Sequence, residues 1–159
     1  MNNLTGLNLS GQTYLKYLDC SNNLISGINL NSCSNITGLY MQNNNLSGNL
    51  DLTQFKNLNE INVSNNSLSG INVTGLDKLR TFQADNNYIT GLDFFGTTNV
   101  QIISASGNSM TGYSNIIGNM TGLVAVNLAG NNLVNPGSLL FWLTGYYGLE
   151  VFISGIFKL

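Results

Sequence analysis

The sequence predicts a β-rich solenoid, in which the chain winds through successive coils of similar length. One asparagine recurs at a nearly fixed spacing, and apolar and polar residues alternate at period two just before it, as in a short half-buried strand. A repeat of about 21 residues also leaves little room for a helix. We therefore expect about seven to eight coils, with parallel strands on a concave face and mostly extended segments on the convex side.

The repeat is marked by one asparagine in each coil. These residues are Asn23, Asn44, Asn66, Asn87, Asn108 and Asn131. By subtraction, the steps between them are 21, 22, 21, 21 and 23 residues. An asparagine amide both donates and accepts hydrogen bonds, so a stacked ladder of asparagines would satisfy backbone groups that the turn would otherwise bury unpaired.

Glycines that recur four residues after these asparagines predict a second corner of the coil. They are Gly27, Gly48, Gly70, Gly91 and Gly112. A left-handed or closely approached backbone favours a residue without Cβ. We expect one or the other at this position.

Segments such as LKYLDCSNNLISGINL from Leu15 and LNEINVSNNSLSGINV from Leu58 follow the pattern LxxLxLxxNxL. From about Leu4 to Glu150 the chain resembles the leucine-rich-repeat family. The second half of each repeat is similar to the irregular 21-residue subclass, with the pattern LxxLxLxxNxLxxLDLxx. The resemblance implies a stack of parallel strands whose concave face binds a partner.

We expect residues 1–159 to form a single solenoid. Residues 1–14 would be a partial N-terminal coil, 15–135 the regular repeats, and 136–159 an aromatic C-terminal cap. The insert after the sixth asparagine contains Pro136 and Ser138, followed by a helix-compatible run. It predicts one short helix near residues 137–144.

Composition argues against several classes of function. The chain has 5 Lys+Arg against 7 Asp+Glu, so no basic stripe is available to neutralise a phosphate backbone, and we expect no nucleic-acid partner. No apolar run of about 18 residues is present, and the first residues lack an export signal, so we expect no membrane insertion. A mature chain whose export signal has been removed would also lack one, so the localisation stays open.

No catalytic, cofactor or metal site is expected. The chain has no histidine, which is the commonest general base and a frequent metal ligand. The acidic residues fall in different repeats, and no glycine loop for phosphate is present. Cys20 and Cys33 occupy apolar positions of their repeats, so we expect two buried free thiols, with a disulfide between them as the alternative.

Residues beside the buried strand positions are the candidates for partner binding. The set comprises Tyr17, Asp19, Tyr40, Asn62, Gln83, Ile102, Ala125, Val151 and Ile153. Toward Val151 and Ile153 the predicted face becomes apolar, which favours a protein contact. Scattered surface apolarity is the alternative explanation. Tyrosines beside neutral amides would also suit a sugar.

The sequence therefore favours a non-catalytic protein-binding or assembly module that uses the concave face, the solenoid ends, or both. A protein partner or self-assembly is expected, and a glycan is the less favoured ligand. One alternative is a structural surface component of a virus particle, such as a decoration or fibre protein. The other is a cell-surface adhesin that binds a glycan or a host protein.

Overall fold

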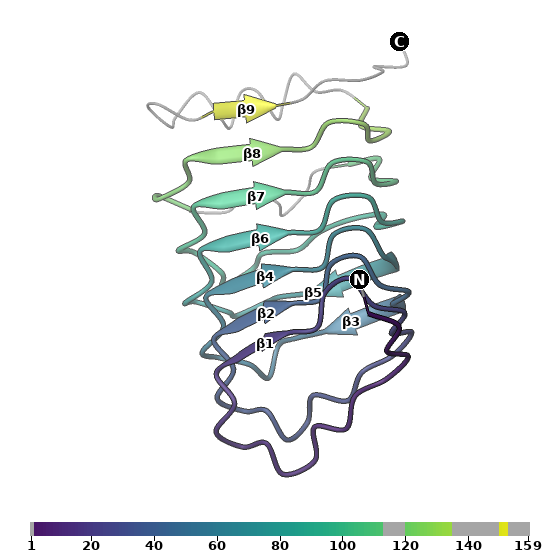
Figure 1. The fold of residues 1–159 in the computed structure, drawn as a ribbon. Helices are drawn as coiled ribbons and strands as arrows, with labels where there is room; N and C mark the ends of the chain where they lie inside the picture. The colour runs from purple at the N-terminus through teal and green to yellow at the C-terminus, as the bar shows by residue number, and fades with distance from the viewer. Residues whose placement is uncertain (1, 113–119, 135–149, 153–159) are drawn as a thin grey trace.

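The computed structural model describes residues 2–112, 120–134 and 150–152. The chain is a β-solenoid of about five turns with parallel strands. Figure 1 shows the strands stacked one above another, from the N-terminal coil to the last strand. No helix occurs in the described residues. The helix predicted near 137–144 and most of the predicted cap lie outside them, and the count of seven to eight coils stays a prediction.

Seven strands of three residues form one parallel sheet in the order β1-β2-β4-β6-β7-β8-β9. Their bounds are β1 Tyr17–Asp19, β2 Gly38–Tyr40, β4 Glu60–Asn62, β6 Thr81–Gln83, β7 Ile102–Ser104, β8 Ala125–Asn127 and β9 Glu150–Phe152. In the first six strands of this sheet the middle residue is buried, as Leu18, Ile61 and Phe82 illustrate. The period-two alternation seen in the sequence therefore produces these strands.

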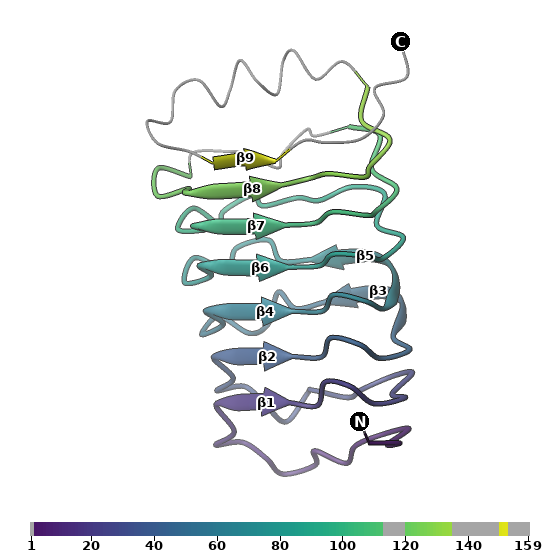
Figure 2. The ribbon, with the colours of Figure 1, turned by 45° about the horizontal axis from the view of Figure 1, so that its top comes forward.

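The opposite side of the solenoid carries a second, smaller sheet. Strands β3 (Ser47–Asp51) and β5 (Ser67–Asn72) pair in parallel, with a shift of register between Gly48 and Asn49. Figure 2 shows this pair behind the seven-stranded sheet. The expected extended segments form regular strands in these two coils alone among the described ones.

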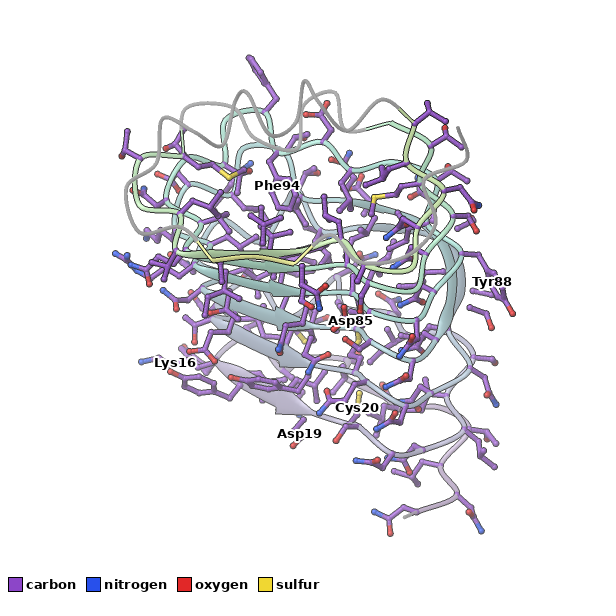
Figure 3. The ribbon with its side chains drawn as sticks, turned by 90° about the horizontal axis from the view of Figure 1, so that it is seen from above. Lys16, Asp19, Cys20, Asp85, Tyr88 and Phe94 are labelled. Carbon is purple, nitrogen blue, oxygen red and sulfur yellow. The ribbon has the colours of Figure 1, made fainter. Side chains whose placement is uncertain are left out.

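Apolar side chains from both sides fill a continuous core. Phe82 of β6 and Phe94 from the opposite side meet with ring centroids 5.1 Å apart and planes at 83°, an edge-to-face contact. Figure 3 shows Phe94 inside the coil, whereas Tyr88 points away from it. Cys20 and Cys33 are buried free thiols. Burial, followed by the nearby Asp19 carboxylate, raises the pKa of Cys20 to about 11.

The six recurring asparagines are all buried. In Asn66, the side-chain Nδ2 donates to the carbonyl of Val63 at 3.0 Å in its own coil and to that of Met41 at 3.0 Å in the preceding coil. Its Oδ1 accepts from the backbone N–H of Leu46 at 2.9 Å, also in the preceding coil. The other asparagines bond in the same way, apart from Asn23, which donates only within its own coil. We call this set the asparagine column.

The residue just before each member of the asparagine column has a left-handed backbone. The residues are Asn22 (φ 57°), Asn43 (φ 57°), Asn65 (φ 56°), Asn86 (φ 53°), Gly107 (φ 63°) and Gly130 (φ 66°). Asparagine and glycine are the residues that tolerate this conformation at least cost. The left-handed corner therefore lies at this position.

The expectation for the later glycines was largely wrong. Of that set only Gly48 has a positive φ, of 75°. At Gly70 a Cβ would lie 2.7 Å from Asn49 Oδ1, a close approach. Gly27, Gly91 and Gly112 have open space where a Cβ would be. The left-handed turn lies five residues earlier in each coil, and most of these glycines need neither a positive φ nor a close approach.

Candidate binding face

The outward side chains of β1, β2, β4, β6, β7 and β8 form one surface, which we call the strand face. The strands pair without a shift, so equivalent residues form columns. The first column is Tyr17, Gly38, Glu60, Thr81, Ile102 and Ala125. The second column is Asp19, Tyr40, Asn62, Gln83, Ser104 and Asn127. Seven of the nine predicted binding residues therefore lie in these columns.

The prediction that Val151 lies beside a buried strand position was wrong. It pairs with the buried Val126, and Glu150 and Phe152 pair with Ala125 and Asn127. Apolar residues occupy four of the five positions from 149 to 153, so alternation alone does not fix the register there. Ile153 lies outside the described residues.

Two tyrosines meet over a glycine at the N-terminal end of the strand face. A Cβ on Gly38 would lie 2.6 Å from Tyr17 Cδ1 and 3.2 Å from Tyr40 Cε2. Glycine therefore leaves the space that both rings occupy. Tyr17 nevertheless remains 67% exposed. Tyr40 donates its hydroxyl hydrogen to Glu60 Oε2. This hydrogen bond, followed by burial and the nearby negative charges, raises the pKa of Tyr40 to about 12.

Carboxylates recur along the strand face. Asp19 accepts a hydrogen bond from the backbone N–H of Ser21 at 3.0 Å. Hydrogen bonds from the hydroxyl and the backbone of Ser21 lower the pKa of Asp19. Asp85, two residues beyond β6, accepts from the hydroxyls of Ser104 and Ser106, each at 2.7 Å. Asp19 is therefore ionised at neutral pH.

Basic side chains lie outside these columns. None of the six strands of the strand face contains a lysine or arginine. Lys16 and Arg80 are exposed and immediately precede β1 and β6. Figure 3 shows Lys16 at one lateral edge of the sheet, away from Asp19. The strand face is therefore negatively charged.

The first column becomes apolar in the C-terminal part of the strand face, whereas the second keeps Ser104 and Asn127. Ile102 is 39% exposed and Val124, just before β8, is 53% exposed, with Ala125 between them in partial exposure. Val124 holds the same position before its strand as Lys16 and Arg80, so it lies at the edge of the strand face and not in its two columns. The predicted set thus separates into a tyrosine and carboxylate group at β1, β2 and β4 and an apolar group at β7 and β8.

Another concavity lies on the opposite side of the solenoid. A hollow of about 280 Å³ has an apolar floor of Ile28, Leu50 and Phe55. Its rim is polar and comprises Asn29, Asn31, Asp51 and Gln54. Asp51 is already bonded to the backbone and hydroxyl of Thr53. None of these rim groups is positioned as a nucleophile beside a base.

Among the residues that the structure describes, no group of three His, Cys, Asp or Glu side chains is close enough to hold a metal ion. In the same part of the chain, no helix has the length and apolar character needed to cross a membrane. Neither finding points to a catalytic or metal site in these residues. The strand face is therefore the candidate binding site.

Comparison with known proteins agrees with the repeat pattern. The family model described as Leucine Rich Repeat matches residues 14–36 and 57–79. No curated protein sequence matches the chain significantly.

Three solved structures have a similar fold. The functional domain of InlJ from Listeria monocytogenes, which includes a cysteine ladder, has a TM-score of 0.77 at 21% identity, covering 98% of this chain and 38% of its own. The plant peptide hormone receptor RGFR1, in complex with RGF2, has a TM-score of 0.70 at 24% identity, covering 97% and 31%. An internalin, InlF, from Listeria monocytogenes has a TM-score of 0.67 at 16% identity, covering 91% and 49%. The chain spans less than half the length of each.

Proposed function

We propose that this chain, which is a leucine-rich-repeat protein, is a non-catalytic module that binds a protein partner through its strand face. The observation that supports this is the strand face itself, where rigid backbone pairing holds outward side chains from six strands in register. Exposed aromatic and apolar groups, such as Tyr17 and Ile102, are the kinds of residue that dominate protein interfaces. Solenoids commonly use such extended surfaces for recognition.

The fold comparisons agree with a binding role. A plant receptor with the same fold is in complex with RGF2. Among the described residues, no group of three His, Cys, Asp or Glu side chains is close enough to hold a metal ion as a competing explanation.

This proposal is tested by selecting binders from an unbiased displayed protein library on the whole chain. The selected binders are then measured against two arginine variants. Gln83→Arg places a bulky charge in the middle of the strand face, whereas Ser69→Arg places the same charge on exposed β5 on the opposite side. We expect most binders to lose affinity for Gln83→Arg and to keep it for Ser69→Arg. Equal loss in both variants, or loss in Ser69→Arg alone, would contradict use of the strand face.

A cell-surface adhesin is the second candidate, supported by the shared fold with an internalin. Beads coated with the chain should adhere to cultured cells, and adhesion should fall with Gln83→Arg but not with Ser69→Arg. Protease treatment of the cells would abolish adhesion to a protein receptor, and periodate would abolish adhesion to a glycan. Beads that adhere no better than uncoated beads would argue against this role.

A further inference from the structure

The strand face carries an unbalanced charge that indicates the chemistry of its partner. Asp19, Glu60 and Asp85 lie along it, and its strands contain no lysine or arginine. In β9, Glu150 pairs with Ala125 of β8 and so continues the first column. A face with one sign of charge attracts ligands of the opposite sign and repels anions such as phosphate.

The two tyrosines concentrate the attraction for positively charged ligands at one end of the strand face. Tyr17 and Tyr40 share the notch at Gly38, and the Tyr40 hydroxyl is bonded to Glu60. Tyrosine rings attract a cation placed over their faces, and a carboxylate nearby adds an ion pair. Glu60 remains exposed and keeps lone pairs for a second donor. This end of the face is therefore suited to a lysine or arginine side chain.

The apolar end of the strand face sets a second requirement. From β2 to β7 there are three strand steps, through β4 and β6. At about 4.8 Å for each step, the tyrosine notch and Ile102 are about 14 Å apart. An extended peptide that crosses the strands advances about 3.3 Å per residue, so it covers this distance in about four residues.

From these observations we propose that the strand face binds an extended basic peptide segment of a partner protein. Its lysine or arginine lies beside Tyr17 and Tyr40, between Asp19 and Glu60. An apolar side chain about four residues away contacts Ile102 and Ala125. This inference rests on the proposed function and specifies the chemistry of the partner. A neutral glycan would leave the three carboxylates unmatched.

Capped synthetic peptides test the inference directly. Each contains one arginine and one leucine in a glycine and serine background, separated by different numbers of residues, and binding to the whole chain is measured by fluorescence anisotropy. We expect the tightest binding when arginine and leucine are about four positions apart. Replacing the arginine by norleucine should weaken binding roughly tenfold, and raising the salt concentration should weaken it further.

Matched variants locate the contact. Tyr17→Ala should weaken binding roughly fivefold, whereas Tyr14→Ala, at a tyrosine that is 90% exposed but outside the strand face, should not change it. Glu60→Gln should weaken binding, and Asp93→Asn, at an exposed carboxylate on the opposite side, should not. Glu60→Lys should reverse the preference toward peptides with glutamate in place of arginine.

Two outcomes would overturn the inference. One is equal affinity for arginine and norleucine peptides, and the other is equal loss with Tyr14→Ala and Tyr17→Ala. If the library-selected binders lose affinity for Gln83→Arg but contain no basic segment, the proposed function stands and this inference fails. If Gln83→Arg spares the selected binders, the proposed function itself fails.

Discussion

Each asparagine of the asparagine column after Asn23 satisfies backbone groups of two coils at once. The amide of Asn66 bonds three carbonyls and one N–H, and most of these partners are buried. Replacing it by a side chain without polar atoms would leave the N–H of Leu46 unpaired and would remove one of two side-chain donors from the carbonyls of Met41 and Val63. The energetic role of this residue therefore lies in avoided desolvation rather than in any single strong bond.

Asn66→Ala should lower the free energy of unfolding by about 3 kcal/mol, because the buried N–H of Leu46 loses its acceptor and the buried carbonyls of Met41 and Val63 each lose one of two side-chain donors. Urea unfolding followed by circular dichroism measures the change. Asn45→Ala is the control, since Asn45 is exposed and next to the asparagine column. Similar destabilisation by both substitutions would show that the buried hydrogen bonds are not the cause.

Tyr40 provides a test of the electrostatics. Its pKa is about 12 in the folded chain against an ordinary value of 10.0, so the folded state holds the proton more tightly. The stability that this contributes is fully present below about pH 10 and is lost as the pH rises through about 12. Absorbance titration of the wild type minus Tyr40→Phe should show one tyrosine ionising near 12, and Glu60→Gln should move that value down toward 10. A difference curve centred near 10 in the wild type would refute the Glu60 contact.

At the scale of elements, the sequence predicted the strands well because buried apolar residues such as Leu39 and Ile61 alternate with polar neighbours. It did not reveal the left-handed corner. The pairs Asn65-Asn66 and Gly107-Asn108 contain the signal, since only asparagine and glycine precede the asparagine column. The register of β9 could not be found from Val151 because its neighbours are apolar as well.

The corner predicts different outcomes for two glycine substitutions. Gly107→Ala should destabilise the chain by about 1 to 2 kcal/mol, because its φ is 63° and the new Cβ would lie 2.5 Å from Asn86 Oδ1. Gly91→Ala should be neutral or stabilise by up to about 1 kcal/mol, since nothing lies within 4 Å of the new Cβ. Thermal unfolding of both variants checks this, and the reverse order would contradict the assignment of the corner.

At the scale of the whole molecule, the N-terminal end of the sheet differs from its middle. In the described residues β1 pairs with β2 alone, and Leu15 is only partly buried where Ile36 and Leu58 are fully buried in the following coils. Residues 2–4 bond to the asparagine column and its neighbours instead of to β1. An exposed strand edge of this kind is a common site of association.

We therefore expect the 159-residue chain to associate at high concentration, as sedimentation velocity would show. Leu4→Lys, at an N-terminal leucine that is 46% exposed, should weaken the association. Phe95→Lys is the control, because Phe95 is 81% exposed at the side of the solenoid. Monomer at every concentration would refute the prediction, and dissociation by Phe95→Lys alone would move the contact from the end to the side.

The hydrogen bonds of the asparagine column also bear on how the molecule responds to force. Every one of them joins a coil to itself or to its immediate neighbour, about 21 residues away, and none reaches further. A chain pulled by its two ends should therefore unwind one coil at a time rather than in a single event. Each step would release about 7 nm of extended chain. Regular extension steps of that size in optical-tweezer traces would show that the coils unfold one after another. A single large extension would show that the whole solenoid unfolds in one event.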